Sequence, residues 1–226
     1  MRILFVCSGN IMRSVIAECA CLYRSRQLLG RSSAALLAES SGLDARNGSS
    51  PHPQALSALE QLGIPIRRIF SSPVDEKMLA RADLAATMTR QQCYLLANRF
   101  PQHSARCFSL LELNGSIETL LAERGLVAGD PGLLLRARSM RLDELEGRLA
   151  DAARLLATTP RLELRPLAGV DMGVVELMRR FPTCFHQVSG IHDPVGGTDE
   201  EVLSCARIID REVTLFLKGI ITLASS

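Results

Sequence analysis

Short apolar runs alternate with amphipathic stretches over the first half of the chain. Each apolar run is bounded by turn residues, a pattern typical of a buried strand, and helical periodicity follows each of them. The strands are expected at residues 2–6, 36–40, 83–88 and 106–110, and the helices at 14–29, 51–62, 74–82 and 89–99. Strands that alternate with helices in this way predict an α/β fold with a doubly wound parallel sheet.

The pattern changes after the fourth expected strand. No convincing strand is found between residues 114 and 188. Residues 139–157 carry leucine and alanine at alternating spacings of three and four, which predicts an amphipathic helix. Two heptads are too few for a coiled coil, so this helix is expected to pack on the domain. We interpret residues 114–188 as a helical insertion within one domain that spans residues 1–226.

The last part of the chain returns to clear helical signals. Thr198 and Glu201 have the spacing of a capping box, in which each side chain accepts a hydrogen bond from the other residue's backbone N–H. The residues that follow place apolar side chains on one face, namely Val202, Cys205, Ile209, Val213, Phe216 and Ile220. We expect this helix to cover the sheet.

The composition is that of an ordinary globular protein, with 226 residues of which 47% are hydrophobic and 22% are charged. No apolar run approaches the ~18 residues needed to cross a bilayer, and the apolar start at Ile3 is too short for a signal peptide. Seven cysteines without a secretory signal fit a reducing compartment. These features predict a cytoplasmic protein with no membrane partner.

Charge and cysteine spacing exclude two further classes of partner. The net charge is +2 and arginines are interleaved with acids along the chain, so nucleic acid is not expected as a partner. Cys19 and Cys21 stand close together without a neighbouring histidine or cysteine pair, which is a poor zinc signature. No metal site is expected.

The candidate chemistry begins in the sequence CSGNIMRS, residues 7–14, between the first strand and the first helix. Such a junction aims several backbone N–H groups at one point, with the positive end of the helix dipole behind them. Gly9 allows close approach of the backbone, and Asn10 tolerates a left-handed conformation. We therefore expect a nest that binds phosphate or another oxyanion. It consists of Ser8, Gly9, Asn10, Ile11, Met12, Arg13 and Ser14.

Cys7 stands at the floor of this nest, where the positive field favours the thiolate. Ser14 can donate a hydrogen bond to the sulfur, and the planar fork of Arg13 can hold two phosphoryl oxygens. The alternative is a buried structural cysteine followed by a chance arginine. The position after an apolar strand, with glycine, asparagine and serine in supporting places, favours attack on phosphorus. The phosphate-binding sequence G-x-x-x-x-G-K-[ST] is absent.

Attack by Cys7 requires an acid that protonates the leaving oxygen and later a base that activates water. Asp193 in the sequence HDPVGG is the best candidate, because a proline stiffens its loop and two glycines lead to the capped helix. A second Asp-Pro pair occurs at Asp130, and we interpret it as an ordinary turn before a helix.

Taken in order, these motifs resemble those of the low-molecular-weight protein-tyrosine phosphatase family. ILFVCSGNIMRSVIAE is similar to the family's N-terminal Cys-x5-Arg-Ser signature, and DPVGGTDEEV is similar to its acid loop and last helix. ESSGLDARNGSSPHPQALSALEQLGI and SSPVDEKMLARADLAATMT look like the segments between them. The resemblance covers about residues 1–113 and 189–218, and the middle of the chain has no counterpart.

The resemblance implies a three-layer sandwich around a four-stranded parallel sheet, and a phosphatase that needs no metal or organic cofactor. It also implies a phosphorylated protein as substrate, with phosphotyrosine as the expected phosphoresidue. Carried over by position, the implied roles are Cys7 as nucleophile and source of a phosphocysteine intermediate, Arg13 as phosphate-binding residue, Asp193 as general acid, and Asn10 as the residue that fixes the loop by side-chain hydrogen bonds with support from Ser14 and Ser40.

Three departures from the family pattern limit what carries over. Met12 stands where the family commonly has a second cysteine, so an oxidised Cys7 has no neighbouring thiol to rescue it. Val15 replaces the usual proline. Val195 stands where an aromatic side chain often walls the pocket beside the acid, so stacking on a phosphotyrosine ring is poorly supported.

Three alternative functions stay open. Protein-arginine phosphatases of the family tend to carry threonine at the position of Ile11, so isoleucine favours an aryl phosphate. Arsenate reductases of this fold need relay cysteines soon after the third strand, whereas Cys93 and Cys107 are far apart. A noncatalytic phosphate-binding module would not need Asp193. The insertion leaves the fourth strand and returns before the acid loop, so we expect it near the active-site mouth, where it could select substrates or mediate self-association.

Overall fold

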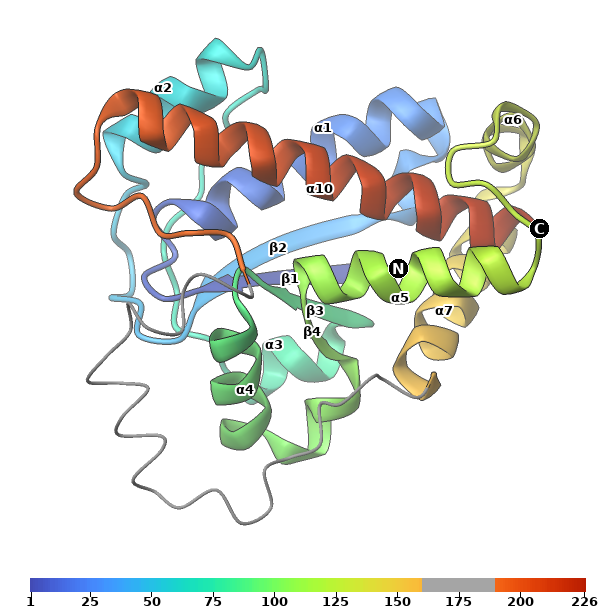
Figure 1. The fold of residues 1–226 in the computed structure, drawn as a ribbon, viewed down its shortest axis with the longest axis horizontal. Helices are drawn as coiled ribbons and strands as arrows, with labels where there is room; N and C mark the ends of the chain where they lie inside the picture. The colour runs from blue at the N-terminus through green and yellow to red at the C-terminus, as the bar shows by residue number, and fades with distance from the viewer. Residues whose placement is uncertain (160–189) are drawn as a thin grey trace.

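The computed structural model describes residues 1–159 and 190–226, and a four-stranded parallel sheet lies at its centre (Figure 1). The strands are β1 (Arg2–Cys7), β2 (Leu37–Gly42), β3 (Leu84–Thr87) and β4 (Cys107–Ser109). They pair in the order β2-β1-β3-β4, so β1 lies between β2 and β3. The predicted parallel α/β fold is confirmed, and no strand boundary differs from its predicted position by more than two residues.

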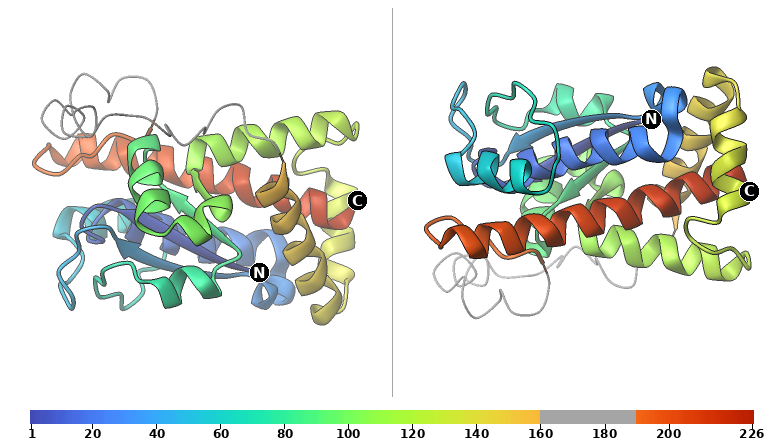
Figure 2. Two further views of the ribbon diagram at one scale, coloured as in Figure 1. Left: turned by 90° about the horizontal axis from the view of Figure 1, so that it is seen from below. Right: turned by 90° about the horizontal axis from the view of Figure 1, so that it is seen from above.

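Helices cover both faces of the sheet, as the predicted three-layer architecture requires (Figure 2). One face carries α1 (Arg13–Leu29), α2 (Pro53–Gln61), α5 (Leu110–Glu123) and α10 (Asp199–Ser225), and the other carries α3 (Glu76–Arg81) and α4 (Arg90–Arg99). Two short 3-10 helices, η1 (Gly30–Ala35) and η2 (Pro101–Arg106), precede β2 and β4. Within the described ranges no helix combines the length and apolarity that a membrane crossing requires.

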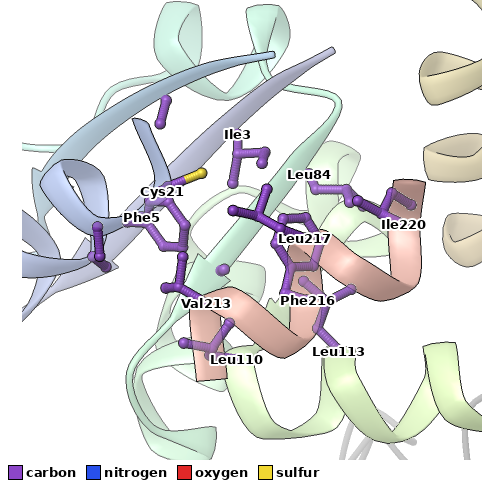
Figure 3. Packing of buried hydrophobic residues seen from close by; sticks show 14 of the residues in the cluster. Ile3, Phe5, Cys21, Leu84, Leu110, Leu113, Val213, Phe216, Leu217 and Ile220 are labelled. Atoms are coloured by element: carbon purple, nitrogen blue, oxygen red, sulfur yellow. The ribbon is translucent and has the colours of Figure 1, made fainter. Parts of the chain in front are cut away.

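The larger apolar core lies between the sheet and α10. Figure 3 shows Ile3 and Phe5 of β1 facing Val213 and Leu217 of α10, and all four side chains are fully buried. Leu4 and Val6 of β1 point to the opposite face, where they join a smaller cluster with residues of α3 and α4. The near-continuous apolar character of β1 follows from this burial on both faces.

The start of α10 carries the predicted capping box. Thr198 Oγ1 accepts a hydrogen bond from Glu201 N at 3.3 Å, and Glu201 Oε2 accepts one from Thr198 N at 2.7 Å. Every residue of the predicted apolar face of this helix is buried. The expectation that the last helix covers the sheet is confirmed, because this face packs in the larger core.

The described part of the insertion is helical, and its first helix belongs to the core. α5 begins directly after β4, so it crosses the predicted insertion start at residue 114. Ser109 caps it, and its buried side chains include Leu113 and Ile117 on the face turned toward α10. α6 (Pro131–Ser139) and α7 (Leu142–Thr158) follow. Residues 160–188 of the predicted insertion lie outside the described residues.

The predicted position of the insertion is wrong for its described part. Gly129 N, just before α6, donates a hydrogen bond to Thr222 Oγ1, and Arg148 of α7 donates one to the carbonyl of Ala224. Both partners lie at the C-terminal end of α10, whereas the acid loop precedes its N-terminal end (Figure 1). A helix of 27 residues is about 40 Å long. α6 and α7 therefore lie far from the mouth of the site.

Candidate active site

The loop between β1 and α1 lies at the edge of the sheet where the carboxyl ends of the parallel strands meet (Figure 1). Cys7 is the last residue of β1 and Arg13 is the first residue of α1, so a strand and a helix hold the two ends of the loop. Within it, Asn10 has a φ of +51°, in the left-handed region that asparagine tolerates. The first-turn N–H groups of α1 have no intrahelical partners and are available to an anion.

The side chain of Asn10 holds the loop from inside. Its Nδ2 donates hydrogen bonds to Ser14 Oγ at 3.0 Å and to Ser40 Oγ at 2.9 Å, while its Oδ1 accepts one from Ser72 N at 2.9 Å. Ser14 Oγ in turn lies 3.0 Å from Cys7 Sγ. All of these side chains are buried. The structure therefore brings the expected nucleophile and its three expected supporting residues into one hydrogen-bonded cluster.

The loop passes very close to the end of β2, at Gly42. A Cβ atom at this position would lie 2.5 Å from Ser8 O and 2.9 Å from Asn10 N, which are backbone atoms of the loop. Both distances are shorter than the contacts that Cβ atoms make with other heavy atoms in folded proteins. Only glycine therefore lets the loop adopt this path beside β2.

We expect Gly42→Ala to lower kcat/KM for p-nitrophenyl phosphate about 10²-fold, because displacing the loop by a fraction of an ångström misplaces every group in it. The matched control is Gly147→Ala in α7, where a Cβ atom meets no atom within 4 Å apart from the adjacent backbone of its own helix. That substitution should leave kcat/KM unchanged and raise the thermal midpoint slightly, since alanine is the better helix former. Wild-type activity in Gly42→Ala would contradict the close approach.

Arg13 joins the loop to a segment far away in the sequence. Its guanidinium donates a hydrogen bond to Ile191 O at 3.1 Å and forms an ion pair with Asp193, a residue 180 positions later. The arginine side chain is 3% exposed, whereas that of Asp193 is 36% exposed. The proposed acid therefore lies at the open side of the site, where a substrate's leaving group would enter.

The backbone before Asp193 is fixed to the end of β3. Ile191 N donates a hydrogen bond to Met88 O at 2.8 Å, and Gly190 forms an antiparallel bridge with Thr89. A Cβ atom at Gly190 would lie 2.7 Å from Thr89 Cα, so this contact also requires glycine. Two residues of anchored backbone thus set the position from which the carboxylate of Asp193 reaches Arg13.

Several groups that support the site were not predicted from the sequence. Gln92 of α4 donates a hydrogen bond from Nε2 to Ser8 Oγ at 3.0 Å, so α4 also supports the loop. The spacing of Thr89 and Gln92 is that of a capping box, which would have predicted the helix start but not this contact. The N–H of Ser72 and the carbonyl of Ile191 act through the backbone, and backbone groups leave no mark in a sequence.

The other predicted residues lie in varied places. Met12 is 2% exposed and packs in the core, whereas Ile11 is partly exposed and its carbonyl accepts a hydrogen bond from His52 N at 2.8 Å. Asp130 caps α6 with its side chain, which fits the interpretation of an ordinary helix start. Among the described side chains, no group of three or more histidines, cysteines and acids is suited to hold a metal ion.

Three further thiols lie buried in the fold. Burial raises the pKa of Cys205 to about 11, and that sulfur donates a hydrogen bond to His192 O at 3.6 Å. Burial also raises the pKa of Cys19 and of Cys21 on α1. These three residues are therefore protonated near neutral pH.

Comparison with known proteins identifies related phosphatases. A family model described as low molecular weight phosphotyrosine protein phosphatase matches residues 2–122. A protein-arginine-phosphatase of Bacillus subtilis (strain 168) is 32% identical over 157 residues, which are 69% of this chain and 97% of that protein. A protein-arginine-phosphatase of Geobacillus stearothermophilus is 30% identical over 150 residues, which are 66% of this chain and 94% of that protein.

Solved structures share the fold. A mutant of YwlE from Bacillus subtilis aligns with a TM-score of 0.56 at 19% identity, over 96% of this chain and 97% of that one. The tyrosine phosphatase Wzb from Escherichia coli K30 aligns with a TM-score of 0.53 at 14% identity, over 94% of this chain and 92% of that one. The family model and the two relatives show that this chain belongs to the low molecular weight phosphotyrosine protein phosphatase family and is a hydrolase of the protein-tyrosine-phosphatase type.

Proposed function

We propose that this enzyme removes phosphate from phosphotyrosine in proteins through a phosphocysteine at Cys7, with Arg13 as the phosphate-binding residue and Asp193 as the acid. The observation that carries the proposal is the meeting of these three residues around one loop, with the guanidinium of Arg13 in contact with the carboxylate of Asp193. A loop that only bound phosphate would gain nothing from a carboxylate, since it repels the anion.

In the first step the Cys7 thiolate attacks phosphorus, so that an S–P bond forms while the bond from phosphorus to the leaving oxygen breaks. Asp193, protonated, transfers its proton to that oxygen. The phosphoryl group takes the place of Asp193 on Arg13, because it offers two oxygens to the guanidinium fork and carries a larger negative charge than one carboxylate. The backbone N–H groups of residues 8–14 donate hydrogen bonds to the remaining oxygens.

In the second step a water molecule attacks the phosphocysteine. The carboxylate of Asp193 takes the water's proton, an O–P bond forms, and the S–P bond breaks. Inorganic phosphate leaves and Cys7 returns as the thiolate. Ser14 supports both steps, because a hydrogen bond to sulfur is strongest when the sulfur is negative.

An apolar side chain of the loop favours an aryl phosphate. This is Ile11, which is partly exposed; Val195, two residues after the acid, is 55% exposed and adds apolar surface but no ring for stacking. Desolvating an aromatic ring against such side chains costs little free energy. The N–H groups of a phosphoguanidinium would instead need hydrogen-bond acceptors there. Phosphoarginine is nevertheless the second candidate, because both curated relatives are named protein-arginine-phosphatases.

The test compares a phosphotyrosine peptide with a phosphoarginine peptide of the same sequence. Wild type is expected to have the higher kcat/KM for phosphotyrosine, and Ile11→Thr is expected to shift the ratio about 10-fold or more toward phosphoarginine, since a hydroxyl supplies an acceptor. Val15→Thr, a buried position on α1 outside the loop, is the control that should keep the wild-type ratio. A wild-type preference for phosphoarginine would establish the second candidate instead.

The remaining alternatives make different predictions for the same samples. An arsenate reductase would couple arsenate to thiol oxidation, and a noncatalytic module would bind phosphate without turning over any phosphopeptide. Phosphopeptide hydrolysis that depends on Cys7 and leaves arsenate unreduced would exclude both.

A further inference from the structure

A buried carboxylate that the chemistry above does not use lies directly behind the phosphate-binding loop. Glu18 is 8% exposed and stands on α1 one turn after Ser14. Its Oε2 accepts a hydrogen bond from Ser40 Oγ at 2.7 Å. The hydroxyl of Ser40 is also the acceptor for Asn10 Nδ2, so Glu18 is connected to the side chain that holds the loop.

The surroundings of Glu18 disfavour the ionised form of its side chain. Burial raises the pKa of this carboxyl, and the charge of Glu39 on β2 adds to the increase, while the hydrogen bond from Ser40 and the charge of Arg67 oppose it. The charge of Glu18 in turn helps to raise the pKa of Cys19 and of Cys21 on the same helix. A buried acid with a raised pKa weakens the fold at pH values above that pKa, because the unfolded chain ionises more easily.

The carboxylate of Glu18 fixes the orientation of the Ser40 hydroxyl, whereas the amide of Asn10, whose Nδ2 only donates, fixes that of Ser14. Ser40 must point its single hydrogen at Glu18, which leaves its oxygen lone pairs for Asn10 Nδ2. The second hydrogen of Nδ2 goes to Ser14 Oγ, and the hydrogen of Ser14 is then left for Cys7 Sγ, 3.0 Å away.

Without the acceptor at Glu18, the Ser40 hydroxyl is free to rotate. When its hydrogen turns toward Asn10 Nδ2, two donors face each other and the contact between Ser40 and Asn10 weakens. The hydrogen bond from Ser72 N to Asn10 Oδ1 would still hold the amide in the loop. The loss of the acceptor should therefore weaken the hydrogen bond on Cys7 without destroying the loop.

We propose that Glu18 is a positioning residue that acts through Ser40: it holds this hydroxyl as an acceptor for Asn10, and so holds the amide that orients Ser14 toward the sulfur of Cys7. This inference rests on the proposed function of Cys7, but it predicts a property of the thiol that can be measured without turnover. Removing Glu18 makes the Cys7 thiolate less stable, while the fold is retained or becomes more stable.

The experiment replaces Glu18 by leucine and by glutamine and follows Cys7 alkylation by iodoacetamide against pH, with the Cys7 peptide quantified by mass spectrometry. In Glu18→Leu the pH midpoint of alkylation should rise by about one unit and kcat/KM for p-nitrophenyl phosphate should fall about tenfold, the effect of losing one buried hydrogen bond. Glu18→Gln keeps an uncharged acceptor. The alkylation midpoint should therefore rise less than in Glu18→Leu, and kcat/KM should fall about threefold instead of about tenfold.

The matched control is Glu212 on α10, a second buried acid, 6% exposed, whose Oε2 accepts a hydrogen bond from Asn114 Nδ2 at 2.8 Å, away from the loop. Glu212→Leu and Glu212→Gln should leave the alkylation midpoint at its wild-type value, whatever they do to the thermal midpoint. The proposal is overturned if a folded Glu18→Leu titrates like wild type, or if Glu212→Leu shifts the midpoint equally. Should Glu18→Leu not fold, an unshifted Glu18→Gln overturns it. A wild type without phosphatase activity would refute the proposed function and leave the alkylation result standing.

Discussion

Cys7→Ser is expected to lower the turnover of p-nitrophenyl phosphate by at least ~10⁴-fold, to the level of the buffer blank. A serine hydroxyl is almost wholly protonated at neutral pH, and the field of one helix N-terminus and one arginine is far too weak to ionise it. The substitution changes one atom, and that atom already makes its hydrogen bond within the loop, so binding of phosphate should persist. The measurement is initial rate against substrate concentration, together with inorganic phosphate binding by calorimetry.

The control for Cys7→Ser is Cys21→Ser, the same substitution at a fully buried thiol within α1. Burial raises the pKa of Cys21, so that thiol cannot serve as a nucleophile near neutral pH, and its variant should keep the wild-type rate below its melting temperature. If Cys7→Ser retained the rate of Cys21→Ser, hydrolysis would not pass through Cys7. If wild type were as slow as Cys7→Ser, the chain would be a phosphate-binding module.

The fold was predictable because it depends on regular patterns. β1 is buried on both faces and is therefore apolar at every position from Ile3 to Val6. The capping residues Thr89 and Thr198 sit at the starts of the helices that they predict. Patterns of this kind act over one element at a time, so they identify strands and helices without showing where distant elements meet.

Contacts across the fold were not predictable from such patterns. The ion pair of Arg13 with Asp193 joins residues that are 180 positions apart, and the motif that indicated Asp193 as the acid did not predict this contact. Glu18 reads as one more polar residue of an amphipathic helix, yet it is buried because Ser40 on β2 offers it a hydrogen bond. Sequence spacing carries no information on a partner that another element supplies.

The position of the insertion was not predictable from the sequence either. Its ends lie at β4 and before the acid loop, and this suggested a position near the active site. α7 instead packs near the start of the sheet through buried leucines such as Leu145 and Leu149, and α6 holds the end of α1 through hydrogen bonds from Arg138 to the carbonyls of Gln27 and Leu28. The apolar face of a helix determines that it is buried, and the fold determines where.

Asp193 and Asp130 offer a second large effect with its control inside the same chain. Each aspartate precedes a proline, but Asp130 only caps α6 through a hydrogen bond from Leu133 N at 2.9 Å. Asp130→Asn should therefore keep the wild-type rate and cost little stability, because asparagine caps helices nearly as well. A loss of turnover in Asp130→Asn as large as that in Asp193→Asn would show that the acid has been assigned to the wrong residue.

Asp193→Asn should lower kcat by ~10²–10⁴-fold, the usual contribution of a positioned general acid, and the deficit should depend on the leaving group. p-Nitrophenolate leaves readily without a proton, whereas the phenolate of tyrosine does not, so the loss should be larger for a phosphotyrosine peptide than for p-nitrophenyl phosphate. The ion pair adds a second signature. Without the carboxylate, Arg13 has no charged competitor for the phosphoryl group, so KM should fall or stay constant while kcat drops. A general structural disturbance would raise KM and affect both substrates equally, and that combination would refute the role of Asp193 as acid.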